Sequence, residues 1–243
     1  MSKLPQITTS IFSKMSLMAN KYNAINLSQG FPDFPIDSEL TRIVEKAVKQ
    51  NVHQYCPSSG HFGLLEQIGL LIHNTYQREI NIKEELLITA GATQGIFTTI
   101  QAIVEPEDEV IILDPSYDCY IAPVLLCKGK PIRISLDNDF LPDWTTIKKH
   151  ITRKTKLIIT NNPHNPSGRT WNKNDMEQLG LLLNENPNLY LLSDEVYEYI
   201  TFEKQHLSAH LYDSLRSRSI IVSSFGKTLH VTGWKMGYLI AEK

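Results

Sequence analysis

Short apolar runs that alternate with helical segments are the feature that most constrains the fold of this 243-residue chain. Each run is about the length of a buried strand, and segments of helical periodicity separate most of them. Strands and helices that alternate in this way form a largely parallel sheet, because each parallel connection crosses over a face of the sheet. We therefore expect one large α/β domain with strands at residues 86–89, 110–113, 132–135, 157–160, 190–193, 219–222 and 238–241.

The segments between these runs have the periodicity of helices and define the expected domain organisation. The first 30 residues predict an extended arm with a short amphipathic helix. We assign residues 1–38 to this arm and residues 39–243 to the large domain. Helices are predicted at residues 39–50, 63–79, 93–104, 117–127, 144–151, 173–185 and 207–215.

Composition and charge exclude several classes of function. The net charge is −2 and no run of like charges occurs, so neither nucleic acid nor an anionic membrane is an expected partner. Residues 1–11 have no apolar core of a signal peptide, and no apolar run approaches the ~18 residues of a membrane span. Cys56, Cys119 and Cys127 have no metal-ligand spacing. We expect no metal site and a cytoplasmic location, where thiols stay reduced.

Small and polar residues gather where four of the predicted strands end. Gly91-Ala92-Thr93 follows the first strand, Asn165 the fourth, Asp194 the fifth and Lys227 the sixth. In open α/β sheets, ligands bind beyond the carboxyl ends of the strands. The sequence therefore predicts a single ligand site at this edge of the sheet.

Lys227 occupies a turn of small residues directly after an apolar strand, and Lys235 follows eight residues later. Gly226-Lys227-Thr228 resembles the end of a phosphate-binding P-loop, but that motif needs a glycine at position 221, which is isoleucine. A surface turn remains an alternative. The other interpretation is an amine that binds a carbonyl covalently beside a phosphate site, as in enzymes that use pyridoxal phosphate (PLP).

Two further segments could contact a ligand, and each has a simpler alternative. In segment 89–95, backbone N–H groups at a helix N-terminus can approach an anion, although Thr93 could simply cap the helix. In segment 161–168, Asn165 could donate to a phenolic oxygen or a carboxylate. Its X-Pro bonds are the usual sites of cis peptides, and the alternative is an ordinary loop.

Asp194 lies at the end of a buried strand, where a carboxylate needs a partner. A pyridinium N–H is one such partner, and the ion pair would keep the ring nitrogen protonated and electron-withdrawing. A helix cap is the alternative for this residue. A metal is disfavoured, because no set of ligands has the required spacing.

Taken together, these motifs resemble a known family. Thr-Ala-Gly-Ala-Thr, Asn-Pro-His-Asn-Pro-Ser-Gly, Ser-Asp-Glu-Val-Tyr and Ser-Ser-Phe-Gly-Lys-Thr occur in this order, with Ser-Gln-Gly-Phe-Pro-Asp-Phe at 28–34 and Asp-Pro-Ser-Tyr-Asp-Cys-Tyr at 114–120. The chain resembles the fold-type I, class I/II PLP-dependent aminotransferases over nearly its whole length. It looks closest to methionine aminotransferases and kynurenine (glutamine) transaminases. The resemblance implies a three-layer α/β/α domain with a seven-stranded, mostly parallel sheet.

The resemblance also implies roles for individual residues. Lys227 would hold PLP as an internal aldimine and transfer the proton of the substrate Cα, while Asp194 would pair with the pyridine nitrogen. Tyr197 and Asn165 would hydrogen-bond the ring oxygen, and Asn165 would also face the substrate. Other residues would complete the site: Gly91, Ala92, Thr93, Ser224 and Lys235 at the phosphate, Tyr117 against the ring, Tyr55 at the phosphate of a neighbouring subunit, and Gly30 at the substrate carboxylate.

Chains of this family extend well beyond 243 residues. The segment that resembles their C-terminal small domain is absent here, and with it the arginine that binds the substrate carboxylate. The chain would then be a truncated product, a fragment or the first of two pieces.

The expected reaction is a ping-pong transamination between an L-amino acid, methionine or a large neutral or aromatic one, and a 2-oxo acid. A homodimer is expected from the same resemblance. A PLP-dependent carbon–sulfur β-lyase and a non-catalytic PLP-binding fragment are the alternatives.

Overall fold

The chain divides into two compact units, residues 1–52 and 53–243, which are described separately. The computed structural model describes residues 3–5, 7–30, 32, 34–202 and 205–243. The expected boundary at residue 38 lies within the first unit, and the roles assigned to the arm and the large domain remain predictions. Phe31 and Asp33 of the motif at 28–34 lie outside the described residues.

Two helices with polar caps lie within the described residues of the first unit. Helix α1 spans Ile11–Tyr22, and Ser10 caps it by accepting a hydrogen bond from the backbone of Ser13 at 3.3 Å. Helix α2 spans Ser38–Val48 and is capped by Asp37. A serine or aspartate at this position satisfies N–H groups that have no partner within the helix. The helix expected in the arm is therefore confirmed.

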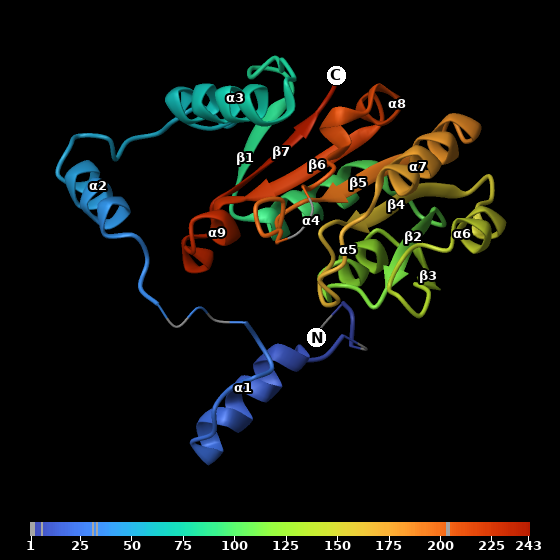
Figure 1. Ribbon diagram of the computed structural model, residues 1–243, viewed down its shortest axis with the longest axis horizontal. Helices are drawn as coiled ribbons and strands as arrows, with labels where there is room; N and C mark the ends of the chain where they lie inside the picture. Colours follow the sequence, from blue (N-terminus) through green and yellow to red (C-terminus); the bar gives the residue numbers. More distant parts are fainter. Residues whose placement is uncertain (1–2, 6, 31, 33, 203–204) are drawn as a thin grey trace. The chain divides into compact units, whose positions relative to one another are not determined.

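The second unit is built on a seven-stranded sheet with the order β1-β7-β6-β5-β4-β2-β3 (Figure 1). All seven expected strands are present. The strands from β6 to β3 are parallel, and β7 is antiparallel to both of its neighbours, β6 and β1. The bounds are β1 Leu86–Thr89, β2 Glu109–Asp114, β3 Lys130–Ser135, β4 Thr155–Asn161, β5 Tyr190–Asp194, β6 Ser219–Ser224 and β7 Gly237–Ala241.

This strand order brings the predicted site residues to one edge of the sheet. Because β7 is antiparallel to both β1 and β6, these two strands run in the same direction. The carboxyl ends of β1, β4, β5 and β6 therefore meet at one edge, and β7 begins there. Segments far apart in the sequence reach the same place, as expected for a ligand site in an open α/β sheet.

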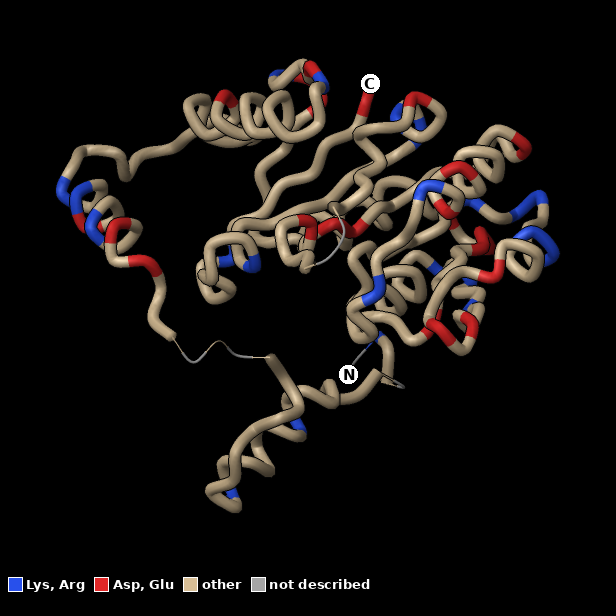
Figure 2. The backbone as a smooth tube through the Cα atoms, viewed as in Figure 1, with Lys and Arg blue, Asp and Glu red and all other residues tan. Residues whose placement is uncertain are grey.

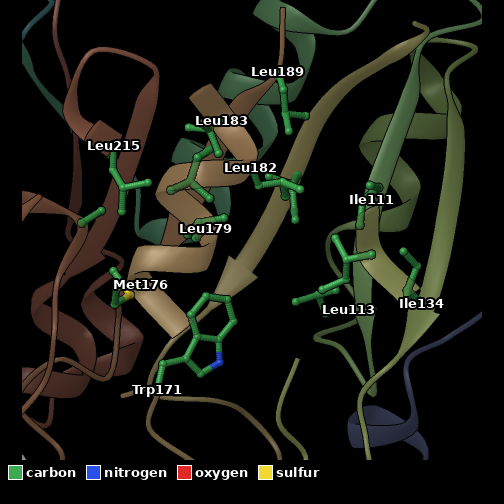
Figure 3. Packing of buried hydrophobic residues seen from close by; sticks show 14 of the residues in the cluster. Ile111, Leu113, Ile134, Trp171, Met176, Leu179, Leu182, Leu183, Leu189 and Leu215 are labelled. Atoms are coloured by element: carbon green, nitrogen blue, oxygen red, sulfur yellow. The ribbon is translucent and has the colours of Figure 1, made fainter. Parts of the chain in front are cut away.

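Helices cover both faces of the sheet. Ile111, Ile158 and Ile221 point to one face, and their neighbours Ile112, Ile159 and Val222 point to the other. Successive side chains of a strand alternate in direction, so both faces are apolar and both need a covering layer. The first core includes residues of α6 (Trp144–His150), α7 (Lys173–Glu185) and α8 (Asp213–Arg216), and Figure 3 shows its packing.

The opposite face is covered by α4 (Ala92–Ile103) and α5 (Ile121–Leu126), which contribute Ile96, Ile100 and Val124 to the second core. Helix α3 (Phe62–Tyr76) packs through Ile68 and Ile72 on β1 and β7. The three-layer α/β/α architecture is therefore confirmed (Figure 1).

Two helix predictions need correction. The helix expected at 117–127 begins only at Ile121. Pro123 explains this start, because proline fits the first turn of a helix and disrupts its interior. The helix expected at 207–215 is instead a short 3-10 turn, Ala209–Leu211, followed by α8. A buried carboxylate, that of Glu195, accepts the backbone N–H of Ala209 at 3.0 Å, so a tertiary contact replaces a helical bond.

Figure 2 shows Lys and Arg interspersed with Asp and Glu along the backbone of the second unit. No helix in the described part of the chain is long and apolar enough to span a membrane.

Candidate active site

Lys227 lies just beyond the end of β6, on the short helix α9 (Phe225–Thr228). Its Nζ atom is 5.4 Å from the centroid of the Tyr197 ring. Burial lowers the pKa of the Lys227 amine and nearby Lys235 lowers it further, while Asp194 acts in the opposite direction. A lysine with a lowered pKa is more often neutral, and the neutral amine is the form that acts as nucleophile and base.

Asp194 ends β5 and is only 3% exposed. Its Oδ2 accepts a hydrogen bond from the hydroxyl of Tyr120 at 2.6 Å, and its Oδ1 accepts a long one from the backbone of Val196 at 3.4 Å. Burial raises the pKa of the carboxyl to about 6, although the Tyr120 bond favours the charged form. The site thus holds a carboxylate that a cationic N–H group would stabilise further.

Tyr197 and Asn165 meet above the ends of β5 and β4. The side-chain amide of Asn165 donates to the Tyr197 hydroxyl at 3.1 Å. Asn161 fixes the loop that carries Asn165: its Oδ1 accepts the Asn165 backbone N–H at 2.7 Å, and its Nδ2 donates to the backbone oxygen of Asp194 at 3.1 Å. As the sequence indicated, X-Pro bonds of this loop are cis, at Pro163 and at Pro166.

The start of β7 lies against the N-terminus of α4. Gly237 pairs with Thr89 on one side and with Ser224 on the other. A Cβ atom on Gly237 would lie 2.6 Å from the carbonyl carbon of Gly91 and 2.7 Å from the nitrogen of Ala92, so only glycine fits. Gly91 itself has a φ of 75°, which glycine adopts readily. This contact brings β7 against the first N–H groups of α4.

Two further residues lie near the N-terminus of α4. Lys235 lies two residues before the start of β7, and its Cα is 3.6 Å from where a Cβ of Gly91 would stand. Thr93 lies in the first turn of α4, and a hydrogen bond links it to Tyr117. Burial raises the pKa of Tyr117 to about 12, so its ring presents a neutral phenol. Helix N–H groups with a nearby lysine can bind a phosphate.

The structure brings most of the predicted residues together at one edge of the sheet. These are Gly91, Ala92, Thr93, Tyr117, Asn165, Asp194, Tyr197, Ser224, Lys227 and Lys235. Tyr55 has a fully exposed side chain, with a relative exposure of 103%. Gly30 belongs to the first unit. The roles expected of Tyr55 and Gly30 therefore stay predictions.

Sequence reasoning missed Tyr120, Asn161 and Gly237. Tyr120 stands in the quoted motif at 114–120 and Asn161 in the quoted loop, but neither received a role. His164, also near the site, is a structural residue: it is buried and bonded to Pro115 O at 2.9 Å and to Ser167 Oγ at 2.6 Å. Three groups at this edge could contact one flat ligand that carries a phosphate and a cationic ring nitrogen. They are the buried carboxylate of Asp194, the amine of Lys227 with its lowered pKa, and the N-terminus of α4.

Comparisons with known proteins agree with this site. The family described as aminotransferase class I and II matches residues 22–243, so the chain belongs to this family. It is 41% identical to the methionine aminotransferase of Escherichia coli over 99% of its own length and 62% of that protein. It is 35% identical to a kynurenine–oxoglutarate transaminase of Dictyostelium discoideum, over 95% of this chain and 58% of that one. The chain thus spans about three fifths of the length of these relatives.

Solved structures show the same relationship. An Escherichia coli structure reported with a methionine aminotransferase function superposes with a TM-score of 0.95 and 40% identity, over all of this chain and 64% of that chain. An aspartate aminotransferase from Thermus thermophilus, solved with maleate, gives a TM-score of 0.91 and 28% identity, over 99% of this chain and 64% of that chain.

Proposed function

We propose that this chain carries the PLP-binding machinery of an aminotransferase. The enzyme would transfer the amino group of an L-amino acid, methionine or a large neutral or aromatic one, to a 2-oxo acid in a ping-pong reaction. The observation that carries the proposal is the convergence of Lys227, Asp194 and the Tyr197–Asn165 pair at one sheet edge. The substrate class follows the names of the similar proteins.

The residues at this edge fit PLP at both ends of the molecule. Asp194 is buried, and the ring nitrogen of PLP would give it the cationic partner that this position favours. The N-terminus of α4, with Ser224 and Lys235, would hold the phosphate. Tyr117 would cover one face of the ring, and the Tyr197 hydroxyl with the Asn165 amide would bind the ring oxygen.

The chemistry is divided between the cofactor and the chain. When bound, PLP supplies an electron-withdrawing ring that stabilises negative charge at the substrate Cα. Asp194 keeps the ring nitrogen protonated, because a buried carboxylate favours the cationic form of its partner. Lys227 Nζ, whose pKa is lowered by burial, takes and returns the proton of the substrate Cα. Tyr197 and Asn165 orient the site through their shared hydrogen bond.

We also propose a homodimer in which Tyr55, exposed in a single chain, reaches the phosphate site of the partner. A cytoplasmic location is supported by three free cysteines, Cys56, Cys119 and Cys127, since thiols persist in a reducing compartment. Gly30 of the arm would contact the substrate carboxylate.

The test is a two-stage reaction of the PLP-loaded chain. L-methionine is added first and the released 2-oxo acid is measured; a second 2-oxo acid is then added and its amino acid product is measured. The proposal predicts one equivalent of 2-oxo acid in the first stage and regeneration in the second, with loss of both in Lys227→Ala. Retained PLP without release of 2-oxo acid would refute transamination by this chain and leave cofactor binding. Pyruvate and ammonia from a cysteine conjugate would instead indicate a β-lyase.

A further inference from the structure

Glu198 is a buried carboxylate directly after Tyr197 that has no part in the chemistry described above. It is 6% exposed and accepts hydrogen bonds from three hydroxyl groups. Ser223 and Tyr76 donate at short range, and Tyr238 donates at 3.4 Å. Burial of this carboxyl raises its pKa, and bonds from Ser223 and Tyr76 oppose that shift. Burial of a carboxylate is unfavourable, and hydrogen bonds to the buried group offset that free energy. The elements that donate these bonds therefore show what Glu198 connects.

Two of the three donors come from the strands on the lysine and phosphate side of the site. Ser223 lies on β6, directly before Ser224 and four residues before Lys227. Tyr238 lies on β7, three residues after Lys235, and pairs with Ser223 across the antiparallel ladder. Tyr76 ends α3 on the other side of the carboxylate. A single side chain thus joins the loop of Tyr197 to both strands.

Glu198 acts where the backbone connection between β5 and β6 stops. The ladder of these parallel strands ends at the pair Asp194–Val222, and the backbone of Glu195 then donates to Val222 O at 2.8 Å. Beyond this point the two segments separate, one leading to Tyr197 and the other to Lys227. The bond from Ser223 Oγ to Glu198 Oε1 links them again.

We propose that Glu198 is a positioning residue that fixes Lys227 relative to Tyr197, by holding β6 through Ser223 and β7 through Tyr238. The site needs this because Lys227 and Tyr197 must reach neighbouring atoms of one ligand, and catalytic groups work within about 0.5 Å of their productive geometry. A residue that only stabilised the fold could accept hydrogen bonds from any neighbouring element. Here two of the donors lie on the strands that lead to Lys227 and Lys235. This inference rests on the proposed function for the identity of the ligand. The link that Glu198 makes between the Tyr197 segment and β6 is a property of the chain and can be tested without PLP.

The test compares Glu198→Met and Ser223→Ala with Tyr76→Phe. Methionine is similar in length to glutamate but has no acceptor oxygen, so the first two variants both remove the bond from Ser223. Tyr76→Phe removes a bond of the same cluster that leads to α3 and not to the strand of Lys227. The first readout is hydrogen exchange in the chain without PLP, at the amides of Leu229 and Val231, which are bonded to Phe225 O and Gly226 O. We expect exchange at these amides to become about tenfold faster in Glu198→Met and Ser223→Ala and to stay unchanged in Tyr76→Phe.

The second readout is the pH midpoint of the visible absorption of the PLP-loaded chain. A hydroxyl that donates to the ring oxygen competes with the neighbouring imine proton for that oxygen. A displaced Tyr197 should therefore raise the midpoint, by about half a pH unit in the two test variants.

Both readouts can overturn the inference. If the test variants melt at lower temperature but exchange at Leu229 and Val231 as the parent does, Glu198 is only a stabilising residue. An unshifted midpoint in a protein that binds PLP would contradict the positioning role as well. Failure of the parent chain to retain PLP would instead refute the proposed function, while the exchange experiment would still decide on Glu198.

Discussion

Replacing Tyr120 by phenylalanine tests how the site controls the charge of Asp194. The change removes a single hydroxyl, which donates to Oδ2 of Asp194 at 2.6 Å, and leaves the buried ring in place. A hydrogen bond to a charged group contributes about 1.5–3 kcal/mol, and one between neutral groups about 0.5–1.5 kcal/mol. The difference, about 1–1.5 kcal/mol, is close to the value of one pKa unit, so Tyr120→Phe should raise the pKa of Asp194 by about one unit.

The sign of the pH dependence follows from the direction of the pKa shift. Burial raises the pKa of Asp194 from 3.8 to about 6 in the folded chain, so this carboxyl costs stability as pH rises between these values. Without Tyr120 the range over which stability is lost extends to higher pH. The variant should therefore lose about 1 kcal/mol relative to the parent at pH 5, where folded Asp194 is largely neutral, and about 2–3 kcal/mol at pH 8.

Urea unfolding of the chain without PLP, at pH 5 and pH 8, measures both values. Tyr199→Phe is the matched control, because the Tyr199 hydroxyl contacts the neutral Thr75 hydroxyl at 3.4 Å and its loss should cost the same at either pH. If the loss of unfolding free energy in Tyr120→Phe is equal at the two pH values, or larger at pH 5, the Tyr120 hydroxyl does not stabilise the charged form of Asp194.

Two further predictions concern packing and acid stability. Gly237→Ala places a Cβ 2.6 Å from the backbone of Gly91, so it should lower the free energy of unfolding in urea by about 1–3 kcal/mol and weaken PLP retention. Gly233→Ala is the control and should change neither, because a Cβ there would have no atom within 4 Å. Equal effects of the two variants would contradict the close approach of β7 and α4. Burial alone would raise the pKa of Glu195, but its bond with His206 lowers it to about 2. The stabilisation by ionised Glu195 is therefore present above pH 4.5 and lost as pH falls toward 2. In Glu195→Gln the free energy of unfolding should depend less on pH in this range. An unchanged dependence on pH would exclude this stabilising role of Glu195.

The strands could be predicted because parallel strands buried on both faces are continuous apolar runs. Helix starts were harder to predict, since local periodicity does not show which tertiary contact competes for the backbone. Pro123 was a usable signal for the late start of α5. The contact between Glu195 and the backbone of Ala209 was not, because it joins residues that only the fold brings together.

The same distinction applies to the site. Lys227, Asp194 and Asn165 could be predicted because each lies at or just after the end of a strand, and the carboxyl ends of parallel strands meet at one edge. Tyr120 could not, because its partner Asp194 lies on a strand that is far away in the sequence. The role of Gly237 depends on β7 lying between β1 and β6, and that strand order is a property of the whole sheet.

The most direct test of the account is to identify the amine that binds PLP. The chain is incubated with PLP, reduced with borohydride to fix any bound cofactor on its amine, digested and mapped by mass spectrometry. The account predicts one cofactor per chain, on Lys227, because burial lowers the pKa of this amine beside Tyr197 and Asp194. Labelling mainly on Lys235 or on exposed lysines, or no stable label, would contradict it.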